Sequence, residues 1–492
     1  MDEISTTAES IAPSTDRFAG SEASRYLGAA AYRDRAFRRK VLAFLDHDWY
    51  RARAPEFGID ERFVATHCRQ AARRETIRNL LMLLAFCMIG FLPLIELATE
   101  AEDANDIGLI LAYYKVELIG AVLAAALVLF VERLITQHYT MTRRFSRERF
   151  AGTATSADPG SDGPQNLIVY GGYSPFVGAG YGIGGWSFSV NLERTRDDLS
   201  ATGAAIPFES GELVAFIGSR LDRLHIASLQ QYEALFADGR HIRAHAALLS
   251  NGKGPRRRIP LATIRALDGL PAAGIRSYLC INVTDWSGEI VLSIYLRCAR
   301  GDSNLFVEAS YFLLTPLQAA FYKIDEIDPR LRIGTLFGLA MQSIVVTPFA
   351  LVMAAFDVLG AMLRPFSRLS ERGSIRQSIE RNPRFNFGAV TSIREMGMQN
   401  YYRVYFQQLD KERHVKTIEQ CTIDAIVDFL SDHNIDTSDI RDRRTAILNN
   451  GVIVSGGDLN AENLAVGKGA KAAISRLGGK PKQSGPSAGA AP

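Results

Sequence analysis

The sequence has few of the features that assign a chain to a class of enzyme or secreted protein. Its 492 residues include only five cysteines, none of them in a C-x-x-C pair. This odd, scattered set excludes a disulfide framework and a zinc site and is typical of reduced thiols facing a cytosol. The formal net charge of +3 is small for this length, which argues against nucleic acid as a partner. Residues 1–20 lack the apolar core of a signal peptide.

Catalytic motifs are also missing. The sequence contains no Walker A motif, no G-x-S-x-G motif and none of the kinase catalytic motifs. His241 and His245 have the i, i+4 spacing of two metal ligands, but no third ligand lies at a familiar distance, so we interpret them as surface histidines on a helix. The carboxylates are dispersed and define no acid–base pair. The sequence therefore predicts no catalytic residue, no metal site and no cofactor.

Apolar residues are abundant, at 47% of the chain against 22% charged residues. This balance excludes a largely disordered protein and a transporter with many spans. One uncharged run covers residues 79–95, and a second run, about 107–131, contains only Lys115 and Glu117. Both runs are long enough for a bilayer core. We therefore predict a transmembrane hairpin over residues 79–132, with spans at about 79–97 and 107–131.

The charges around this hairpin predict its orientation. The loop between the two runs carries Glu100, Glu102 and Asp103 and no basic residue. The outer flanks are rich in arginine, at positions 69, 73, 74 and 78 before the hairpin and 143, 144, 147 and 149 after it. The positive-inside rule then puts both flanks in the cytoplasm. We therefore expect a multi-pass membrane protein with a cytoplasmic N-terminus.

A third apolar segment, residues 333–363, is less clear. It is long enough to span, but Pro348 divides it, Asp357 interrupts it, and arginines flank both of its ends. Two interpretations stay open: a re-entrant or surface-lying helical hairpin, and a third span.

The rest of the chain divides by composition. Helices are expected in residues 23–78, with Asp60 as an N-cap. β-Structure is expected to dominate residues 166–325, where the last three strands should form an antiparallel meander. Within that domain, residues 210–247 read as helical. A helical module follows in 364–449. Polar or low-complexity composition predicts disorder at residues 1–22 and 473–492 and a linker at 150–165.

The most unusual stretch is YGGYSPFVGAGYGIGGWSFSV, residues 170–190, in which three glycines match G-x-G-x-x-G. A dinucleotide site needs a helix after the motif, but a strand follows here. The order strand, glycine-rich turn, strand is closer to the phosphate-binding lid of a kinase. A structural hairpin loop with positive φ angles is the alternative, and a loop that binds a small ligand or partner lies between the two. The candidate ligand-loop residues are Tyr173, Gly178, Gly180, Gly182, Gly185 and Trp186.

Two further patterns point to surfaces. Arginines recur every four residues after the third apolar segment, and this stripe could meet anionic lipid headgroups or be a solvated helix face. It comprises Arg364, Arg368, Arg372 and Arg376. A short β-prone block repeats in residues 450–472 and predicts either a self-pairing β-arch or a hairpin that caps the preceding helices. The self-assembly candidates are Asn450, Gly451, Val452, Ile453, Val454, Asn463 and Val466.

Several of these stretches together resemble a known family. RYLGAAAYRDRAFRRKVL, the hairpin, NLIVYGGYSPFVGAGYGIGGWSF and AIVDFLSDHNIDTSDIRDRRTAILNNGVIVSGG are similar to uncharacterised integral membrane proteins of actinobacteria such as Streptomyces. The resemblance covers about residues 24–472 and implies this organisation and a bacterial origin, but no activity, cofactor or catalytic residue. With the predicted orientation, a bacterial origin implies a location in the bacterial cytoplasmic (inner) membrane. The tail more loosely resembles short C-terminal repeats of bacterial conflict and signalling proteins.

The sequence thus predicts an α+β membrane protein with a transmembrane helical hairpin, a cytoplasmic α+β domain with an antiparallel sheet, and a C-terminal helical module. We expect a non-enzymatic, membrane-anchored sensor, scaffold or signalling effector that contacts the lipid bilayer and binds a protein partner or forms a homo-oligomer. Two alternatives stay open. One is a membrane-bound enzyme that binds a phosphate-bearing ligand at the glycine-rich loop. The other is a small oligomeric channel or membrane-permeabilising effector, suggested by Lys115 and Glu117.

Overall fold

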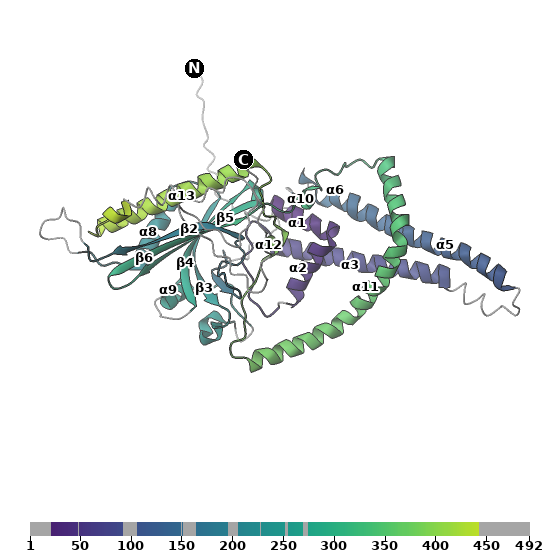
Figure 1. Cartoon of the computed structure of the whole chain (residues 1–492), viewed down its shortest axis with the longest axis horizontal. Helices are drawn as coiled ribbons and strands as arrows, with labels where there is room; N and C mark the ends of the chain where they lie inside the picture. The colour runs from purple at the N-terminus through teal and green to yellow at the C-terminus, as the bar shows by residue number, and fades with distance from the viewer. Residues whose placement is uncertain are drawn as a thin grey trace, which may run out of the picture.

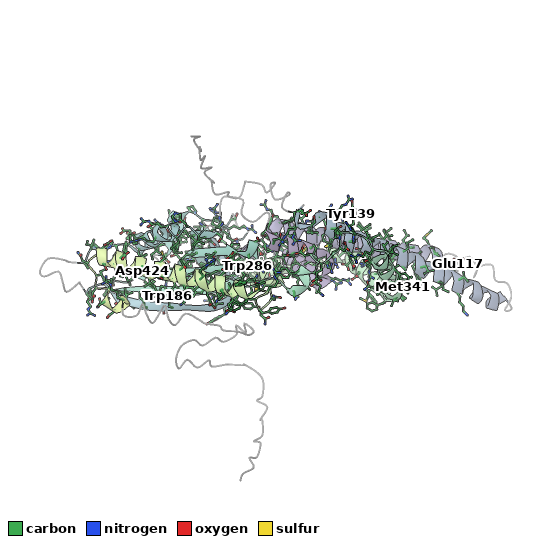
Figure 2. The ribbon with its side chains drawn as sticks, turned by 90° about the horizontal axis from the view of Figure 1, so that it is seen from above. Glu117, Tyr139, Trp186, Trp286, Met341 and Asp424 are labelled. Carbon is green, nitrogen blue, oxygen red and sulfur yellow. The ribbon has the colours of Figure 1, made fainter. Side chains whose placement is uncertain are left out.

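The computed structural model is elongated, with a sheet domain at one end and a group of long helices at the other (Figures 1 and 2). It describes residues 21–47, 49–91, 106–148, 150, 164–194, 205–226, 228–250, 254–268 and 274–441. Residues 1–20, nearly all of the predicted linker, the β-prone repeat and the predicted disordered tail lie outside these residues. Ser21 and Glu22 were predicted to be disordered, but they form the N-cap and the first residue of a helix.

Three N-terminal helices connect the two ends of the molecule: α1 (Glu22–Arg33), α2 (Arg35–His47) and α3 (Glu61–Phe86). Asp60 accepts a hydrogen bond from the backbone N–H of Phe63 and so caps α3, as its position in the sequence predicts. Buried side chains of all three helices share one core with the segment after the sheet. α3 then continues without a break into the first apolar run and ends in a π-helical turn, Cys87–Phe91.

Among the residues that the structure describes, two helical stretches are long and apolar enough to cross a membrane, Lys115–Arg144 and Ile333–Arg381. The first comprises most of α5 (Asp106–Arg133), the π-helical turn Leu134–Thr140 and α6 (Met141–Arg144). Only 22% and 11% of their most apolar windows are buried inside the molecule. Most of the apolar surface of these two stretches is therefore not covered by protein in this structure, which is compatible with a membrane protein.

The third apolar segment forms one helix, α11 (Ile333–Arg381), and not the helical hairpin that was one expectation for residues 333–363. Pro348 and Pro365 lie inside it. Each removes one backbone hydrogen bond, and the helix curves without ending (Figure 1). Its first half crosses α5 and α3, and its second half returns towards the sheet domain (Figure 1).

The sheet has six strands in the order β1-β3-β4-β5-β6-β2. The predicted meander is confirmed: β4, β5 and β6 pair antiparallel in sequence order. The expectation of a purely antiparallel sheet is wrong, because β1 pairs parallel with β3. The strands are β1 (Leu167–Tyr170), β2 (Tyr181–Asn191), β3 (Leu229–Asp238), β4 (Ile275–Asp285), β5 (Ile290–Arg300) and β6 (Asn304–Leu314).

The predicted helix over residues 210–247 is correct only for its first part, α8 (Ser210–Asp222). The following stretch, LQQYEALFAD, is β3. It is made largely of good helix formers, but it is paired on both sides, with β1 and with β4, and its last residues are buried. Tertiary pairing therefore overrides the local helix preference.

Each face of the sheet has its own apolar core. On one face, α8 and α13 (Tyr405–Asp432) pack against β2, β4, β5 and β6. The residues predicted to form the apolar face of an amphipathic helix near the C-terminus are buried in this core: Val415, Ile418, Ile426, Phe429 and Leu430. On the other face, α9 (Leu261–Asp268) and the segment after α11 cover β1, β3 and β4. The short helices α10 (Ala319–Tyr322) and α12 (Ile393–Gly397) lie between the sheet and the N-terminal helices.

Candidate functional site

The glycine-rich segment joins β1 to β2, which lie at opposite edges of the sheet. It therefore crosses the sheet and is not the hairpin loop that was one interpretation. Phe176 anchors the crossing, since its ring contacts an aromatic ring on each of the four central strands. These are Phe236 of β3, Tyr278 of β4, Tyr295 of β5, which stacks on it at 4.4 Å between ring centroids, and Phe312 of β6.

Two glycines in this segment are required by the backbone. Gly178 has φ +89° and Gly180 has φ +84°, a region that residues with a side chain rarely adopt. A Cβ at Gly178 would lie 2.5 Å from the carbonyl oxygen of Pro55, and one at Gly180 would overlap the carbonyl oxygen of Leu313. These glycines therefore allow the segment to pass against neighbouring backbone.

The backbone amides of this segment that could bind an anion already bind a carboxylate of the protein itself. The backbone N–H groups of Gly178 and Gly180 both donate to Oε1 of Glu395, at 3.0 Å each. The other carboxylate oxygen, Oε2, accepts from the N–H of Ser392 and the hydroxyl of Thr391. Burial raises the pKa of Glu395, and the four hydrogen bonds oppose this shift. A carboxylate from α12 thus sits where a ligand phosphate would need to bind.

The six ligand-loop candidates do not gather around one cavity. Gly182 and Gly185 lie within β2 and pair with Phe312 and Ser310 of β6. Tyr173 is fully exposed. Trp186 stacks on Phe188, with 5.3 Å between their ring centroids, and packs against the core that α13 covers.

α12 is held by a second buried carboxylate. Glu56 accepts hydrogen bonds from the backbone N–H groups of Ile393 and Arg394, at 2.6 and 3.1 Å. Burial raises the pKa of Glu56 to about 8. Arg394 is itself fully buried and donates to the carbonyl oxygens of Glu289 and Thr315. Burial lowers its pKa to about 10. The side chains of Glu56 and Arg394 therefore fix α12 between the N-terminal helices and the sheet.

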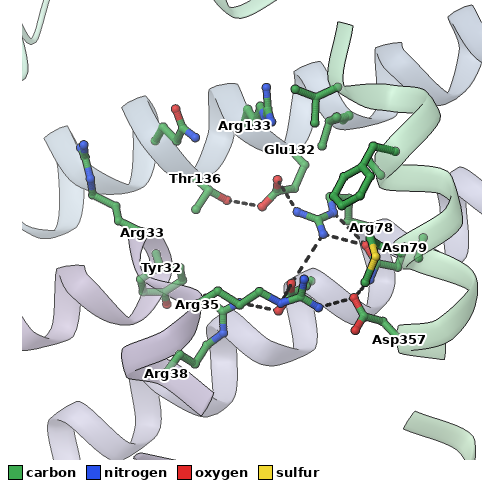
Figure 3. Close-up of a pocket in the computed structure, with 18 residues that line it drawn as sticks. Tyr32, Arg33, Arg35, Arg38, Arg78, Asn79, Glu132, Arg133, Thr136 and Asp357 are labelled. Carbon is green, nitrogen blue, oxygen red and sulfur yellow. Dashed lines mark hydrogen bonds and ion pairs between the residues drawn. The ribbon is translucent and has the colours of Figure 1, made fainter. Parts of the chain in front are cut away.

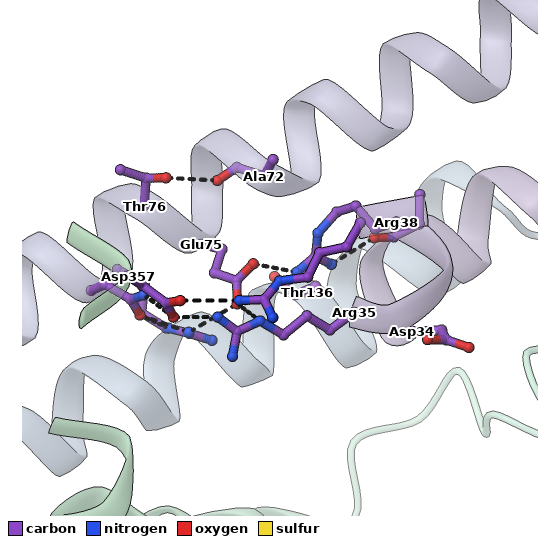
Figure 4. Close-up of polar contacts among 12 residues, drawn as sticks. Asp34, Arg35, Arg38, Ala72, Glu75, Thr76, Thr136 and Asp357 are labelled. Atoms are coloured by element: carbon purple, nitrogen blue, oxygen red, sulfur yellow. Dashed lines mark hydrogen bonds and ion pairs between the residues drawn. The ribbon is translucent and has the colours of Figure 1, made fainter. Parts of the chain in front are cut away.

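A network of ion pairs, here called the charged junction, lies where α2, α3, α5 and α11 meet (Figures 3 and 4). Arg35 of α2 bridges two carboxylates, Glu75 of α3 and Asp357 of α11. Arg39, one turn further along α2, also pairs with Asp357, at 3.1 Å. The amide of Asn79 donates to the same carboxylate. Asp357 therefore attaches α11 to both α2 and α3.

The junction continues to α5. Arg78 lies 3.7 Å from Glu75 and 3.5 Å from Glu132, and Thr136 donates to Glu132 (Figure 3). Arg38 of α2 also pairs with Glu75. A cavity of about 290 Å³ opens beside these residues, with an apolar wall from α5 and α11. The charged junction consists of Arg35, Arg38, Arg39, Glu75, Arg78, Glu132 and Asp357.

α2 contributes both to the charged junction and to the core around α12. Its arginines at positions 35 and 39 hold Asp357, while Phe37 and Val41 are buried in the core that contains Ile393 of α12. α12 in turn carries Glu395, which binds the glycine-rich segment. One short helix therefore contacts both the membrane-type helix α11 and the element that holds the sheet crossing.

The arginine stripe lies on the second half of α11, and all four side chains are exposed. Arg368 pairs with Asp46 at 2.5 Å and Arg372 lies over the ring of Trp49. These two contacts fix α11 along the end of α2. The self-assembly candidates in residues 450–466 lie outside the described residues.

The histidine pair does not lie on a helix. His241 and His245 flank a 3₁₀ turn, Ile242–Ala244, so the expected shared helix face is wrong. In the part of the chain that the structure describes, no group of three or more histidine, cysteine, aspartate or glutamate residues could hold a metal ion.

Sequence reasoning passed over the residues that make these contacts. Ser392 and Glu395 form a capping box, whose S-x-x-E pattern is readable in the sequence. Asp357 is visible as a single charge in an apolar run. Its arginine partners on α2 lie more than 300 residues away, at separations of 322 and 318, and no local pattern connects them.

Comparison with known proteins identifies the family. A profile described as an AbeC-like domain matches residues 185–461, more than half of the chain, and the chain therefore belongs to this family. The match includes α11 and the charged residue Asp357, and it begins inside β2, after β1 and the crossing segment. No curated protein and no solved structure matches the chain.

Proposed function

We propose that this AbeC-like protein is a non-enzymatic sensor or signalling effector attached to the bacterial cytoplasmic membrane, in which membrane helices and a cytoplasmic sheet domain are mechanically coupled. The observation that supports this proposal is the position of α2. It holds Asp357 of α11 through two arginines and packs on α12, whose Glu395 binds the glycine-rich segment. A movement of α11 would therefore be transmitted through α2 and α12 to the sheet.

The proposed topology has α3 and α5 crossing the bilayer and α11 lying across their cytoplasmic ends. Both flanks of α11 pack on the same body: Asp325, before it, pairs with Arg25 of α1 at 2.8 Å, and Ala389, after it, pairs with Val169 of β1. A single crossing would put these two flanks on opposite sides of the membrane. A curved helix that leaves and rejoins one domain fits the cytoplasmic leaflet better, with its exposed apolar side chains in the lipid.

Labelling of single cysteines tests this topology. Arg330→Cys and Arg384→Cys place a thiol on exposed positions on either side of α11, in a full-length chain in which the exposed Cys87 is replaced by serine. We expect a membrane-impermeant maleimide to label both positions in inside-out vesicles and neither in spheroplasts. Labelling of the two positions from opposite sides would show that α11 crosses the bilayer, and the proposed function would then be abandoned.

Hydrogen exchange tests the coupling. Asp357→Asn weakens the pairs with Arg35 and Arg39, and we expect faster exchange at the amides of Gly178 and Gly180 in the full chain reconstituted into nanodiscs. A rise in exchange of about fivefold corresponds to ~1 kcal/mol of local stability.

Glu380→Gln provides the matched control, because it removes one carboxylate from an exposed position on the same helix. Exchange at the two glycines should be unchanged by this variant. If Asp357→Asn also leaves these amides unchanged while exchange at the junction itself rises, the two regions are independent and α2 does not transmit the change.

A further inference from the structure

The cavity beside the charged junction is built from two unlike walls. One wall is apolar and comes from α5 and α11. It is lined by Leu129, Val346, Phe349, Ala350, Met353 and Ala354. The other wall carries most of the charge and is formed by α1, α2, α3 and the end of α5 (Figure 3). At about 290 Å³ the cavity is close to the ~300 Å³ lower range of ligand pockets and far larger than a single water needs.

The charged wall has an excess of positive charge. Five arginines line the cavity, Arg33, Arg35, Arg38, Arg78 and Arg133, against three carboxylates, Glu75, Glu132 and Asp357, so the formal charge of the lining is 5 − 3 = +2. Each carboxylate already has an arginine partner within the charged junction. The lining therefore attracts an anion beyond those that the described residues supply.

Two of the arginines are not used by the junction. Among the described residues, neither Arg33 nor Arg133 has an ion-pair partner, and Nη1 of Arg133 is buried without any hydrogen-bond partner. A buried guanidinium N–H without an acceptor is costly, and a bound phosphate oxygen is an acceptor that guanidinium groups bind well. This unpaired donor is the second observation that points to a ligand.

The position of the cavity selects an amphipathic ligand. It lies beside Asn79, where the first apolar run begins, and beside Glu132, just after the second run ends. On the proposed topology, which this inference rests on, that level is the headgroup region of the cytoplasmic leaflet. Basic pockets between membrane helices on the cytoplasmic side suit anionic phospholipid headgroups, and the apolar wall would contact the acyl chain.

We infer that this cavity binds a phosphate group, supplied by the headgroup of an anionic phospholipid, and that Arg33 and Arg133 are the residues that recognise it. Such a ligand would contact α1, α5 and α11 at once. It would also lie next to Asp357, so that its binding would act on the residue that attaches α11 to α2. The cavity would then report the local content of anionic lipid to the sheet domain.

Native mass spectrometry of the full chain in detergent tests this inference. The probes are dioleoylphosphatidylglycerol, dioleoylphosphatidylcholine with the same acyl chains, and inorganic phosphate. We expect phosphatidylglycerol to bind about tenfold more tightly than phosphatidylcholine, and the double variant Arg33→Gln/Arg133→Gln to remove this preference. Because neither arginine takes part in the ion pairs, the variant should keep the thermal midpoint of the unmodified chain.

Arg223→Gln/Arg258→Gln is the matched control, since it removes two exposed arginines from the sheet domain. It should keep the lipid preference. Binding of inorganic phosphate that depends on Arg33 and Arg133, without a preference for phosphatidylglycerol, would support the site and assign it to a soluble phosphate. An equal affinity for both lipids together with no phosphate binding would overturn the inference.

The labelling of residues 330 and 384 separates this outcome from a failure of the proposed function. If both positions face the cytoplasm and the lipids bind equally, only the cavity assignment is wrong. If the positions face opposite sides, the proposed topology is wrong whatever the lipids do, so the two failures give different results.

Discussion

The two ends of this molecule satisfy their polar groups in different ways. In the sheet domain, the glycine-rich segment has its two available N–H groups bound by Glu395 and its crossing packed by Phe176. Among the helices, arginines exceed carboxylates around a cavity, and the buried Nη1 of Arg133 has no hydrogen-bond partner among the described residues. In the most conspicuous motif of the sequence, the amides of Gly178 and Gly180 are therefore already occupied by Glu395, while dispersed arginines form the place that is open to a ligand.

The largest effect expected from this comparison is at Gly180. Gly180→Ala forces a side chain into a left-handed backbone and against the carbonyl oxygen of Leu313, so β2 would have to move away from β6. We expect a loss of about 4 kcal/mol in the free energy of unfolding, measured by denaturant titration of the detergent-solubilised chain.

Gly182→Ala is the control within the same motif. Its added Cβ would meet only the ring of Phe312, at 3.5 Å, which is ordinary contact, and its φ is not in the left-handed region. The free energy of unfolding should change by less than about 1 kcal/mol. If the two variants behave alike, the packing account of the glycines is wrong.

The sequence predicts well those elements whose partners are close in the chain. The meander from β4 to β6 follows from short polar turns between β-rich runs, and the cap at Asp60 follows from local spacing. β3 is missed because its partner β1 lies about 60 residues upstream and its own composition favours a helix. Register between distant strands leaves no local pattern to read.

The candidate site is missed for the same reason. The G-x-G-x-x-G spacing is visible, but whether its amides are free depends on Glu395, more than 200 residues away. The cavity is built from five helices, α1, α2, α3, α5 and α11, most of which are far apart in the sequence. What the sequence does show is the single charge of Asp357 in an apolar run, and such a charge is expensive unless it is paired, so it can be read as a sign of a partner.

A second prediction concerns the ion pairs at the other end. Glu75 pairs with three arginines, Arg35, Arg38 and Arg78, and its side chain is only 18% exposed. Glu75→Gln leaves these guanidinium groups close together without their shared anion. We expect a loss of about 2 kcal/mol in the free energy of unfolding, less than for a fully buried pair.

Salt dependence sharpens this test. Glu380→Gln, at an exposed position on α11, should change the free energy of unfolding by less than about 0.5 kcal/mol. The loss in Glu75→Gln should also shrink at high salt, because screening weakens the repulsion between the arginines. A loss below 0.5 kcal/mol for both variants would mean that the charged junction contributes nothing to stability.

The smallest expected effect is a pH dependence at the contact between the two ends. The pKa of Glu56 is raised to about 8 by burial, from an ordinary value of 4.5, so the folded state holds its proton more tightly than the unfolded state does. Its contribution to stability is therefore complete below about pH 4.5 and is lost as the pH rises through about 8. Between pH 7 and pH 9 the free energy of unfolding should fall by about 1 kcal/mol, followed by thermal unfolding monitored through tryptophan fluorescence.

Glu56→Gln isolates this contribution, because glutamine keeps the shape of the side chain and does not titrate. Titration of His67 does not contribute to the slope in this pH range. Burial lowers the pKa of His67 to about 4, so its side chain is neutral in the folded and unfolded states above pH 7. Between pH 7 and pH 9 the free energy of unfolding should fall by about 1 kcal/mol less in the variant than in the unmodified chain. Cys68, Cys280 and Cys298, whose pKa values burial also raises, lower the stability of both chains equally over this range, and Glu395 still holds the glycine-rich segment. An unchanged slope in Glu56→Gln would mean that the carboxylate is ionised in the folded state at neutral pH. α12 would then be held by a charge at its N-terminus, and the connection between the two ends would not weaken as the pH rises.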